Sequence, residues 1–246
     1  MRRLGIVGAG RNACILANRA RELGIETHCF AWEAGAMAKD VVDVFHDVSV
    51  TEVEKISRLC RELGVGGVVS TSEFTILPTA QIAEACGLNG NPVEVAARIT
   101  NKYRNREATS GVPGLNHPRY WRVTDPSEIA ALDVTYPIIV KPTSEGGKRG
   151  ICVARDAEEL SAAVSYSEGE PNRSSAFIVE EFLEGGREYS VESLSFHGKN
   201  YIVQVTEKES SGAPHCVELG HHQPANLSDA MRAKVEQVMD RALTAG

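Results

Sequence analysis

The chain has 246 residues, of which 42% are hydrophobic and 24% are charged, so it is long enough to bury a core and is not expected to be disordered. Its formal net charge is −7, which argues against a nucleic-acid-binding protein, because neutralising backbone phosphates requires clustered Lys and Arg. That charge still allows a small anionic ligand in a local basic pocket.

The six cysteines are scattered along the chain without a C-x-x-C pair or another close ligand spacing. This pattern predicts free thiols in a reducing, cytoplasmic compartment rather than disulfides or a zinc site. The N-terminus has no long apolar segment, so no signal peptide is expected. No window of about 18 apolar residues is present, so neither a membrane span nor a membrane partner is expected.

The first part of the chain, residues 1–90, alternates short apolar runs with helical patterns. Strands are expected at 3–7, 26–32, 41–45 and 65–71, and helices within 8–24, 51–64 and 74–87. Strands that alternate with helices at this spacing predict a parallel sheet with crossover helices, and so an α/β domain.

From residue 92 the pattern changes to α+β. Residues 92–111 are expected to form one helix, with Pro92 at its start and Gly111 past its end. Short strands are then expected at 117–123, 136–142, 150–154 and 176–182, with a helix at 156–166. Residues 188–208 alternate polar and apolar, which predicts a hairpin with its turn at His197–Asn200, and a last helix is expected at 228–245.

The first candidate motif is G-x-G-x-x-A, made by Gly8, Gly10 and Ala13 directly after a strand. Glu33 lies 20 residues beyond Ala13, at the end of the second strand. Glycines for a tight turn and an acidic residue for a ribose are the arrangement of a dinucleotide site, which would indicate an NAD-dependent oxidoreductase. Glycines in such a turn can equally be structural, because any strand–helix unit of this kind needs a tight first turn.

A second set of residues follows in the later half. Lys102 lies in a helical segment, Lys141 ends a strand, the glycine-rich loop 144–150 comes next, and Glu188 follows the strand end at 180–183. Each has an ordinary explanation as a solvated lysine, a hairpin loop or a surface acid. Together they meet the needs of a triphosphate, which requires cations from separate elements and glycines that let backbone amides approach phosphates.

These segments, in this order, resemble the ATP-grasp superfamily, and within it the carboxylate–amine ligases of the amino-acid ligase and carbamoyl-phosphate-synthase-like type. The resemblance covers essentially the whole chain and implies a Rossmann-like domain followed by an ATP-grasp fold that lacks its C-terminal strands. The implied parts are a pre-ATP-grasp domain at 1–90, a helical connection at 91–112, a small lid subdomain at 113–184, and an incomplete large subdomain at 185–246. In that superfamily the preceding domain generally holds no dinucleotide, which disfavours NAD.

The resemblance also implies roles for single residues. Lys102 and Lys141 would contact ATP phosphates, 144–150 would cover them, 180–183 would bind adenine through backbone groups, and Glu188 would bind the ribose. The implied ATP site consists of Lys102, Lys141, Ser144, Glu145, Gly146, Gly147, Gly150, Glu180, Glu181, Phe182, Leu183 and Glu188. Lys148 and Arg149 depart from the common serine- and glycine-rich form of the loop and are the only catalytic candidates, as cations that neutralise phosphate.

The segment HCVELGHHQPANL, residues 215–227, places Glu218, His221 and His222 close together. It is either a loop with incidental histidines or, by the same resemblance, a segment near the substrate, with Glu218 and His221 as the contacts. Its spacing does not support a metal site.

The resemblance implies an enzyme that uses ATP and Mg²⁺ to join a small carboxylate, such as an amino acid, to an amine through an acylphosphate. The metal ligands of such enzymes lie on strands beyond the helix at 228–245, so no metal ligand is expected in this chain. The chain is therefore expected to be incomplete, with a C-terminal segment missing, or to act as a homodimer. A nucleotide-binding module without catalysis is the alternative, beside the NAD-dependent oxidoreductase.

Overall fold

The computed structural model describes residues 2–169 and 176–245. The chain divides into two compact units, Met1–Thr100 and Asn101–Gly246, called here the N-terminal and C-terminal units. The division falls within the segment 92–111, which the sequence predicted as one helix.

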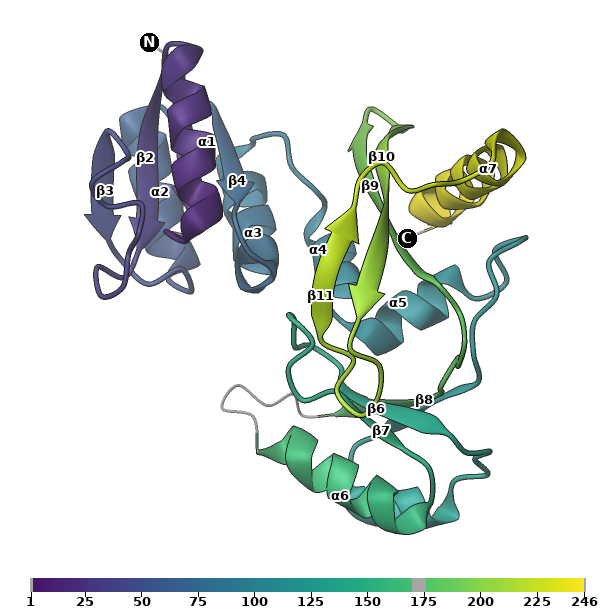
Figure 1. Ribbon diagram of the computed structural model, residues 1–246. Helices are drawn as coiled ribbons and strands as arrows, with labels where there is room; N and C mark the ends of the chain where they lie inside the picture. Colours follow the sequence, from purple (N-terminus) through teal and green to yellow (C-terminus); the bar gives the residue numbers. More distant parts are fainter. Residues whose placement is uncertain (1, 170–175, 246) are drawn as a thin grey trace. The chain divides into compact units, whose positions relative to one another are not determined.

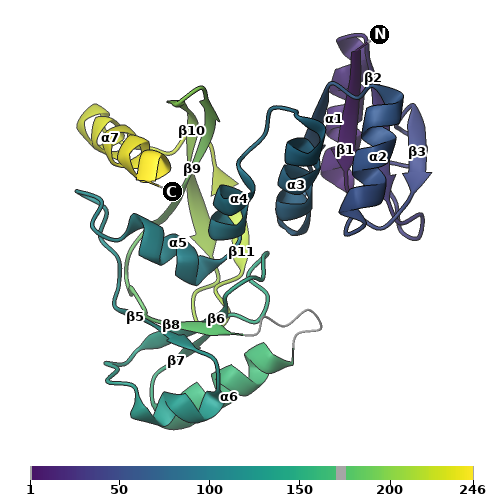
Figure 2. The same ribbon diagram turned by 180° about the vertical axis from the view of Figure 1, so that it is seen from behind.

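The N-terminal unit is a parallel four-stranded sheet with the strand order β3-β2-β1-β4. Its strands are β1 (Arg2–Val7), β2 (Ile25–Ala31), β3 (Val44–Asp47) and β4 (Gly67–Ser70), and its helices are α1 (Arg11–Glu22), α2 (Val53–Leu63), α3 (Ile76–Cys86) and α4 (Val93–Ile99). The two views place α1 on one face of the sheet and α2 on the other (Figures 1 and 2). The predicted parallel sheet with crossover helices is therefore confirmed.

The core of this unit follows the apolar patterns that predicted its strands. Ile6, Val7 and Phe30 are fully buried, and Ala13 and Ala17 of α1 pack against them. Small alanines one helical turn apart let the helix lie close to the sheet, while the larger side chains come from the strands.

The C-terminal unit contains two antiparallel sheets. The first has the order β5-β8-β6-β7 and the second the order β11-β10-β9. Their strands are β5 (Tyr120–Val123), β6 (Ile138–Pro142), β7 (Cys152–Ala154), β8 (Phe177–Glu181), β9 (Glu188–Phe196), β10 (Lys199–Ser210) and β11 (Glu218–His222). The helices are α5 (Lys102–Thr109), α6 (Ala157–Glu168) and α7 (Asp229–Ala245). A core of Ile138, Val140 and Val179 from the first sheet packs against Leu160 and Val164 of α6.

The single helix predicted at 92–111 is wrong, because the chain forms α4 and α5 with a break at Thr100 and Asn101. Asn101 has an extended backbone and its side chain accepts a hydrogen bond from the Arg104 amide at 3.0 Å. Asparagine favours this N-cap position, since its side chain satisfies an amide that has no partner at the start of a helix. The new helix start makes Lys102 the first residue of α5.

The predicted hairpin of β9 and β10 is confirmed, with a tighter turn than expected. His197 and Gly198 connect the strands, and both have positive φ angles, 49° and 73°. Two such residues match the twist of the flanking strands in a two-residue turn. The strand β11 was not predicted: it lies in the segment 215–227 and pairs with β10, with His221 opposite Lys208.

The last helix was expected to need a sheet to cover its apolar stripe. In α7 no described residue is fully buried, and Met231 remains 47% exposed. The helix packs on β10, where the Asn200 side chain donates to Asp240 at 2.9 Å. The stripe is therefore only partly covered by the residues that the structure describes.

Candidate functional site

A cavity of about 830 Å³ lies within the C-terminal unit. Its walls are the segment 182–188, the end of β10 at 207–210, and Ala213 and Cys216 of the following loop. Small-molecule sites are usually clefts of about 300–1,000 Å³ with a few convergent polar groups. Phe182, Leu183 and Glu188 were expected at a nucleotide site from the sequence, and the structure brings them together at this cavity.

Lys141 does not stand alone at the end of β6. Its Nζ atom lies 2.5 Å from Oε2 of Glu180 on the neighbouring strand β8. Arg106 of α5 approaches the other carboxylate oxygen, with Nε 2.7 Å from Oε1. Glu180 is 1% exposed. Burial by itself raises the pKa of the Glu180 carboxyl, but Lys141 and then Arg106 outweigh it and hold that pKa below its usual value.

The start of α5 is attached to the chain just after β6. The Lys102 amide donates to the Thr143 carbonyl at 2.7 Å, and the Lys102 ammonium donates to the Glu145 carbonyl. The Asn101 side chain also reaches Ser144 Oγ at 3.4 Å. A helix and a loop far apart in the sequence are thereby joined, so Lys102, a predicted phosphate contact, lies beside Ser144 at the start of the loop predicted to cover the phosphates.

The glycine-rich loop is held at several points. Glu145 is buried and its Oε2 atom lies 3.5 Å from Nη2 of Arg149. Lys148 has a φ of 60°, a conformation that is costly for a residue with a side chain. Gly147 and Gly150 share such positive φ angles at no comparable cost. The turn is thus narrow and directs the charge of Lys148 towards β9.

Two lysines and two glutamates form a cluster beside the cavity. The Lys148 ammonium donates to both oxygens of Glu188, at 3.1 and 3.2 Å. The Lys208 ammonium lies 2.6 Å from Oε1 of Glu218 and 3.6 Å from Oε1 of Glu188. His221 Nε2 lies 3.2 Å from the other oxygen of Glu218. The predicted substrate contacts, Glu218 and His221, therefore join the predicted ribose residue through lysines.

Contacts within this cluster shift the pKa values of Glu218 and Lys208. The hydrogen bond from Lys208 is the largest influence on Glu218 and lowers the pKa of its carboxyl. Burial alone lowers the pKa of the Lys208 ammonium, but the bonds to Glu218 and the charge of Glu188 raise it overall. Both shifts favour the charged forms, so the Lys208–Glu218 pair stays ionised near neutral pH.

In the segment 180–183, which was predicted to bind adenine through backbone groups, two backbone amides already donate hydrogen bonds within the protein. The Glu181 amide donates to the Arg119 carbonyl and the Phe182 amide to the Pro137 carbonyl, both at 3.0 Å. Leu183 is 72% exposed at the cavity. These bonds hold the strand end at the cavity, but they leave the amides of Glu181 and Phe182 engaged within the protein.

Arg106 and Lys208 were missed by the sequence reasoning. Arg106 lies four residues after Lys102, so the two share a face of one helix, and that spacing is the signal that points to it. Lys208 had no such local signal, because its neighbours Glu188 and Glu218 come from other strands.

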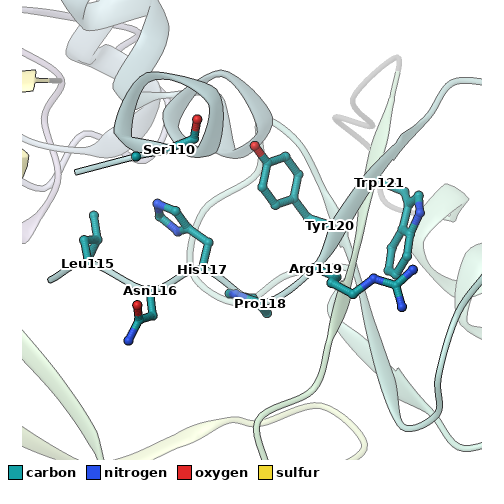
Figure 3. A pocket seen from close by; sticks show the side chains of 9 residues that line it. Ser110, Leu115, Asn116, His117, Pro118, Arg119, Tyr120 and Trp121 are labelled. Atoms are coloured by element: carbon teal, nitrogen blue, oxygen red, sulfur yellow. The ribbon is translucent and has the colours of Figure 1, made fainter. Parts of the chain in front are cut away.

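A second cavity of about 470 Å³ lies along residues 110–121 of the same unit (Figure 3). Its polar groups are engaged: His117 Nε2 lies 3.1 Å from Thr109 Oγ1, and the Tyr120 hydroxyl donates to Glu107 at 2.5 Å. The latter bond is the main reason why the pKa of Tyr120 is raised to about 12. Arg119 lies beside Trp121, away from His117. This cavity lacks the convergent charges of the first.

The G-x-G-x-x-A turn of the N-terminal unit has a packing explanation. Gly8 has a φ of 95°, and a Cβ atom there would lie 2.8 Å from Thr71 Oγ1. The Glu33 carboxylate, expected at a ribose in the NAD hypothesis, pairs with the Lys39 ammonium. The NAD-dependent alternative is not favoured.

Neither a metal-binding cluster nor a membrane-spanning helix is found among the described residues. No group of three or more His, Cys, Asp or Glu side chains could hold a metal ion among residues 2–169 and 176–245. In those same residues, no helix is both long and apolar enough to cross a membrane.

Residues 134–245 match the family model described as an ATP-grasp domain. The chain is 28% identical over 223 residues to a formate-dependent phosphoribosylglycinamide formyltransferase of Synechococcus sp. (strain RCC307), covering 89% of this chain and 53% of that protein. The chain thus spans about half the length of this curated relative.

Solved structures share the fold. An L-amino acid ligase from Bacillus licheniformis superposes with a TM-score of 0.84 at 23% identity, over 100% of this chain and 60% of that one. The biotin carboxylase domain of a Hydrogenobacter thermophilus 2-oxoglutarate carboxylase, in complex with MgADP, ADP and bicarbonate, gives 0.82 at 20% identity, over 99% and 58%. The expected mixed fold, with a Rossmann-like domain before an ATP-grasp fold, is thereby confirmed.

Proposed function

Residues 134–245 match the ATP-grasp domain model, and we propose that the chain serves as an ATP-dependent ligase of this family that joins a small carboxylate to an amine. The similar proteins include an L-amino acid ligase and a formyltransferase that uses formate. Their names mention an amino acid and formate, which are both small carboxylates, and this supports an amino acid or another small acid as the first substrate.

The convergence of cations from separate elements carries the proposal. Lys102 and Arg106 come from α5, Lys141 from β6, Lys148 and Arg149 from the loop after β6, and Lys208 from β10. Four carboxylates, those of Glu145, Glu180, Glu188 and Glu218, pair with members of this set of six cations. The set keeps a surplus of positive charge in a protein with a net charge of −7, which favours an anionic ligand such as the triphosphate of ATP.

We assign the nucleotide to the 830 Å³ cavity and the elements beside it. Phe182 and Leu183 would lie against the adenine, and Glu188 would accept hydrogen bonds from the ribose hydroxyls. The loop 144–150 would cover the phosphates, with Lys102 and Lys141 as cations from other elements. Glu188 is now bound to Lys148, so ribose binding would release that ammonium to move towards the phosphates.

The proposed reaction has two transfers. A carboxylate oxygen attacks the γ-phosphorus of ATP, the bond from that phosphorus to the β,γ-bridging oxygen breaks, and ADP leaves with its electron pair. The amine nitrogen then attacks the acyl carbon of the acylphosphate, inorganic phosphate leaves, and the nitrogen loses a proton to solvent. The side chains act by orienting reactants and neutralising charge, without a protein nucleophile.

We propose ATP and Mg²⁺ as the cofactors, since one similar structure was solved with MgADP. Mg²⁺ bound to the phosphates would neutralise part of their charge. The described residues offer no set of three ligands for it, so no side chain of this chain is assigned to the metal.

The substrates would meet β11. Glu218 is held ionised by Lys208 and lies 3.2 Å from His221, which suits it to hold the amine substrate, whose ammonium form would lose a proton to solvent before the neutral nitrogen attacks. A cytoplasmic location accords with six free cysteines. A homodimer is a separate proposal, for which sedimentation of the purified protein is the test.

ADP release in the presence of Mg²⁺ tests the proposed function. With pools of amino acids and small acids, we expect ADP and phosphate only when a carboxylate and an amine are both present. Stabilisation by ATP without ADP release under any pool would instead identify a nucleotide-binding module. Stabilisation by NAD but not by ATP would contradict the proposal altogether.

A further inference from the structure

We propose that Glu180 is a positioning residue, whose buried carboxylate holds Lys141 and Arg106 in the orientation that binds the phosphates. The proposal rests on the proposed ATP site. It differs from the role that the resemblance implies for Glu180, which is a backbone contact to adenine. No reacting atom touches Glu180 in this scheme, since it acts through the two cations.

The backbone of Glu180 is committed to the sheet. The strand β8 lies between β5 and β6, with Glu180 opposite Tyr120 on one side and Ile139 on the other. Lys141 is two residues from Ile139, so the Lys141 and Glu180 side chains are diagonal neighbours on one face. The sheet itself therefore sets where the carboxylate meets the ammonium.

The carboxylate is shared between the two cations. Oε2 lies 2.5 Å from Lys141 Nζ and Oε1 lies 2.7 Å from Arg106 Nε, while the Glu180 side chain is only 2% exposed. A charge so buried is stable only when paired and hydrogen-bonded. An ammonium has three N–H donors, and the bond to Glu180 uses one, which fixes the direction of the others.

The charges explain why this arrangement suits a phosphate. Two cations and one carboxylate leave one net positive charge on the trio formed by Lys141, Arg106 and Glu180. Without the carboxylate, the two cations would repel each other and lose their common anchor. The Glu180 carboxylate thus lowers the total positive charge of the site, while it holds the Lys141 and Arg106 side chains in place.

Glu180→Gln gives a test in which charge and position predict opposite results. Gln keeps the size but removes a negative charge, so simple attraction predicts tighter binding of ATP. The positioning role predicts that Glu180→Gln binds ATP about tenfold more weakly, because about one charge-assisted contact to the phosphates is lost. Affinity is measured by calorimetry, with Glu128→Gln as the control, because that carboxylate caps Thr124 away from the trio and its loss should leave affinity unchanged.

A double-mutant cycle separates positioning from general structural damage. If Glu180 acts through Lys141 and Arg106, then Glu180→Gln should weaken ATP binding in the wild-type background and have a smaller effect in the Lys141→Gln background, where only Arg106 is left for Glu180 to position. Affinity equal to or tighter than wild type in Glu180→Gln would overturn the proposal. Additive losses in the double variant would overturn it as well.

A second measurement does not depend on ATP. Acetylation of lysines by acetic anhydride, followed by mass spectrometry, should modify Lys141 faster in Glu180→Gln than in the wild type, relative to Lys55. If wild type fails to bind ATP but this acceleration occurs, the proposed function fails and the positioning of Lys141 stands. An unchanged rate would overturn the positioning role. Should Glu180→Gln not fold, Glu180→Asp retains the charge on a shorter side chain, and the same acceleration is expected.

Discussion

Two glycine-rich turns of this protein differ in what their glycines do. In the turn after β1, packing explains Gly8, since a Cβ atom there would collide with Thr71, whereas a Cβ atom on Gly10 would meet nothing within 4 Å. The loop after β6 has open space around Gly147 and carries Lys148, which bonds to Glu188. Glycine spacing alone therefore does not distinguish the two turns; their charged partners do, and the phosphate role of the second turn is a proposal to be tested.

The largest expected effect that tests this comparison comes from Lys141→Ala. We expect ATP affinity to fall by roughly 100-fold, the scale of truncating one member of a buried charge pair. Unfolding free energy should also fall, by less than the roughly 3–5 kcal/mol of a fully buried pair, because Arg106 still binds Glu180. Calorimetric titration measures the ATP affinity, and thermal unfolding measures the change in stability. Lys55→Ala, at an exposed pair with Glu52, is the control, and unchanged affinity in Lys141→Ala would remove this site assignment.

Gly8→Ala examines the other turn. We expect a loss of about 2 kcal/mol of unfolding free energy, because the positive φ and the contact with Thr71 both oppose a side chain. ATP affinity should not change. Gly10→Ala is a matched control in the same turn, since a Cβ atom there meets nothing within 4 Å. Should ATP affinity fall in Gly8→Ala while the fold stays intact, the packing explanation would be wrong.

Glu188→Ala should reveal the ribose contact. We expect the preference for ATP over 2′-deoxy-ATP to decrease about fivefold, which corresponds to about 1 kcal/mol for a lost hydrogen bond. Competition against a fluorescent ATP analogue measures both affinities. An unchanged preference would show that Glu188 serves only as the partner of Lys148.

The smallest expected effect is a change of stability with pH. The pKa of Glu180 is lowered in the folded protein, so its contribution is present above the usual carboxyl pKa of 4.5 and is lost as the pH falls through the folded value. Thermal unfolding between pH 7 and pH 3 should therefore show a steeper decline in the wild type than in Glu180→Gln. If the stability of the wild type and of Glu180→Gln declined in parallel with falling pH, the ionised pairing of Glu180 with Lys141 and Arg106 would be contradicted.

The sequence was sufficient for features encoded over short distances. Alternation of apolar runs and helical patterns predicted the parallel sheet of the N-terminal unit, and the alternation over 188–208 predicted the hairpin. The position of Lys141 at a strand end, before a glycine-rich loop, was also readable, because a strand and its following turn are local. The resemblance carried by these segments predicted the ATP-grasp family, whose domain model matches residues 134–245.

Only the tertiary structure decided which charges meet. Arg106 and Glu180 are 74 residues apart and Lys141 and Glu180 are 39 apart, so no periodicity in the sequence records their contact. The same holds for Lys208, whose partners arrive through the pairing of β9 and β11 with β10. The break between α4 and α5 also escaped prediction, because the helical pattern continues through Asn101, where a side-chain cap starts a new helix. Local pattern set the elements, and long-range packing set the charge pairs.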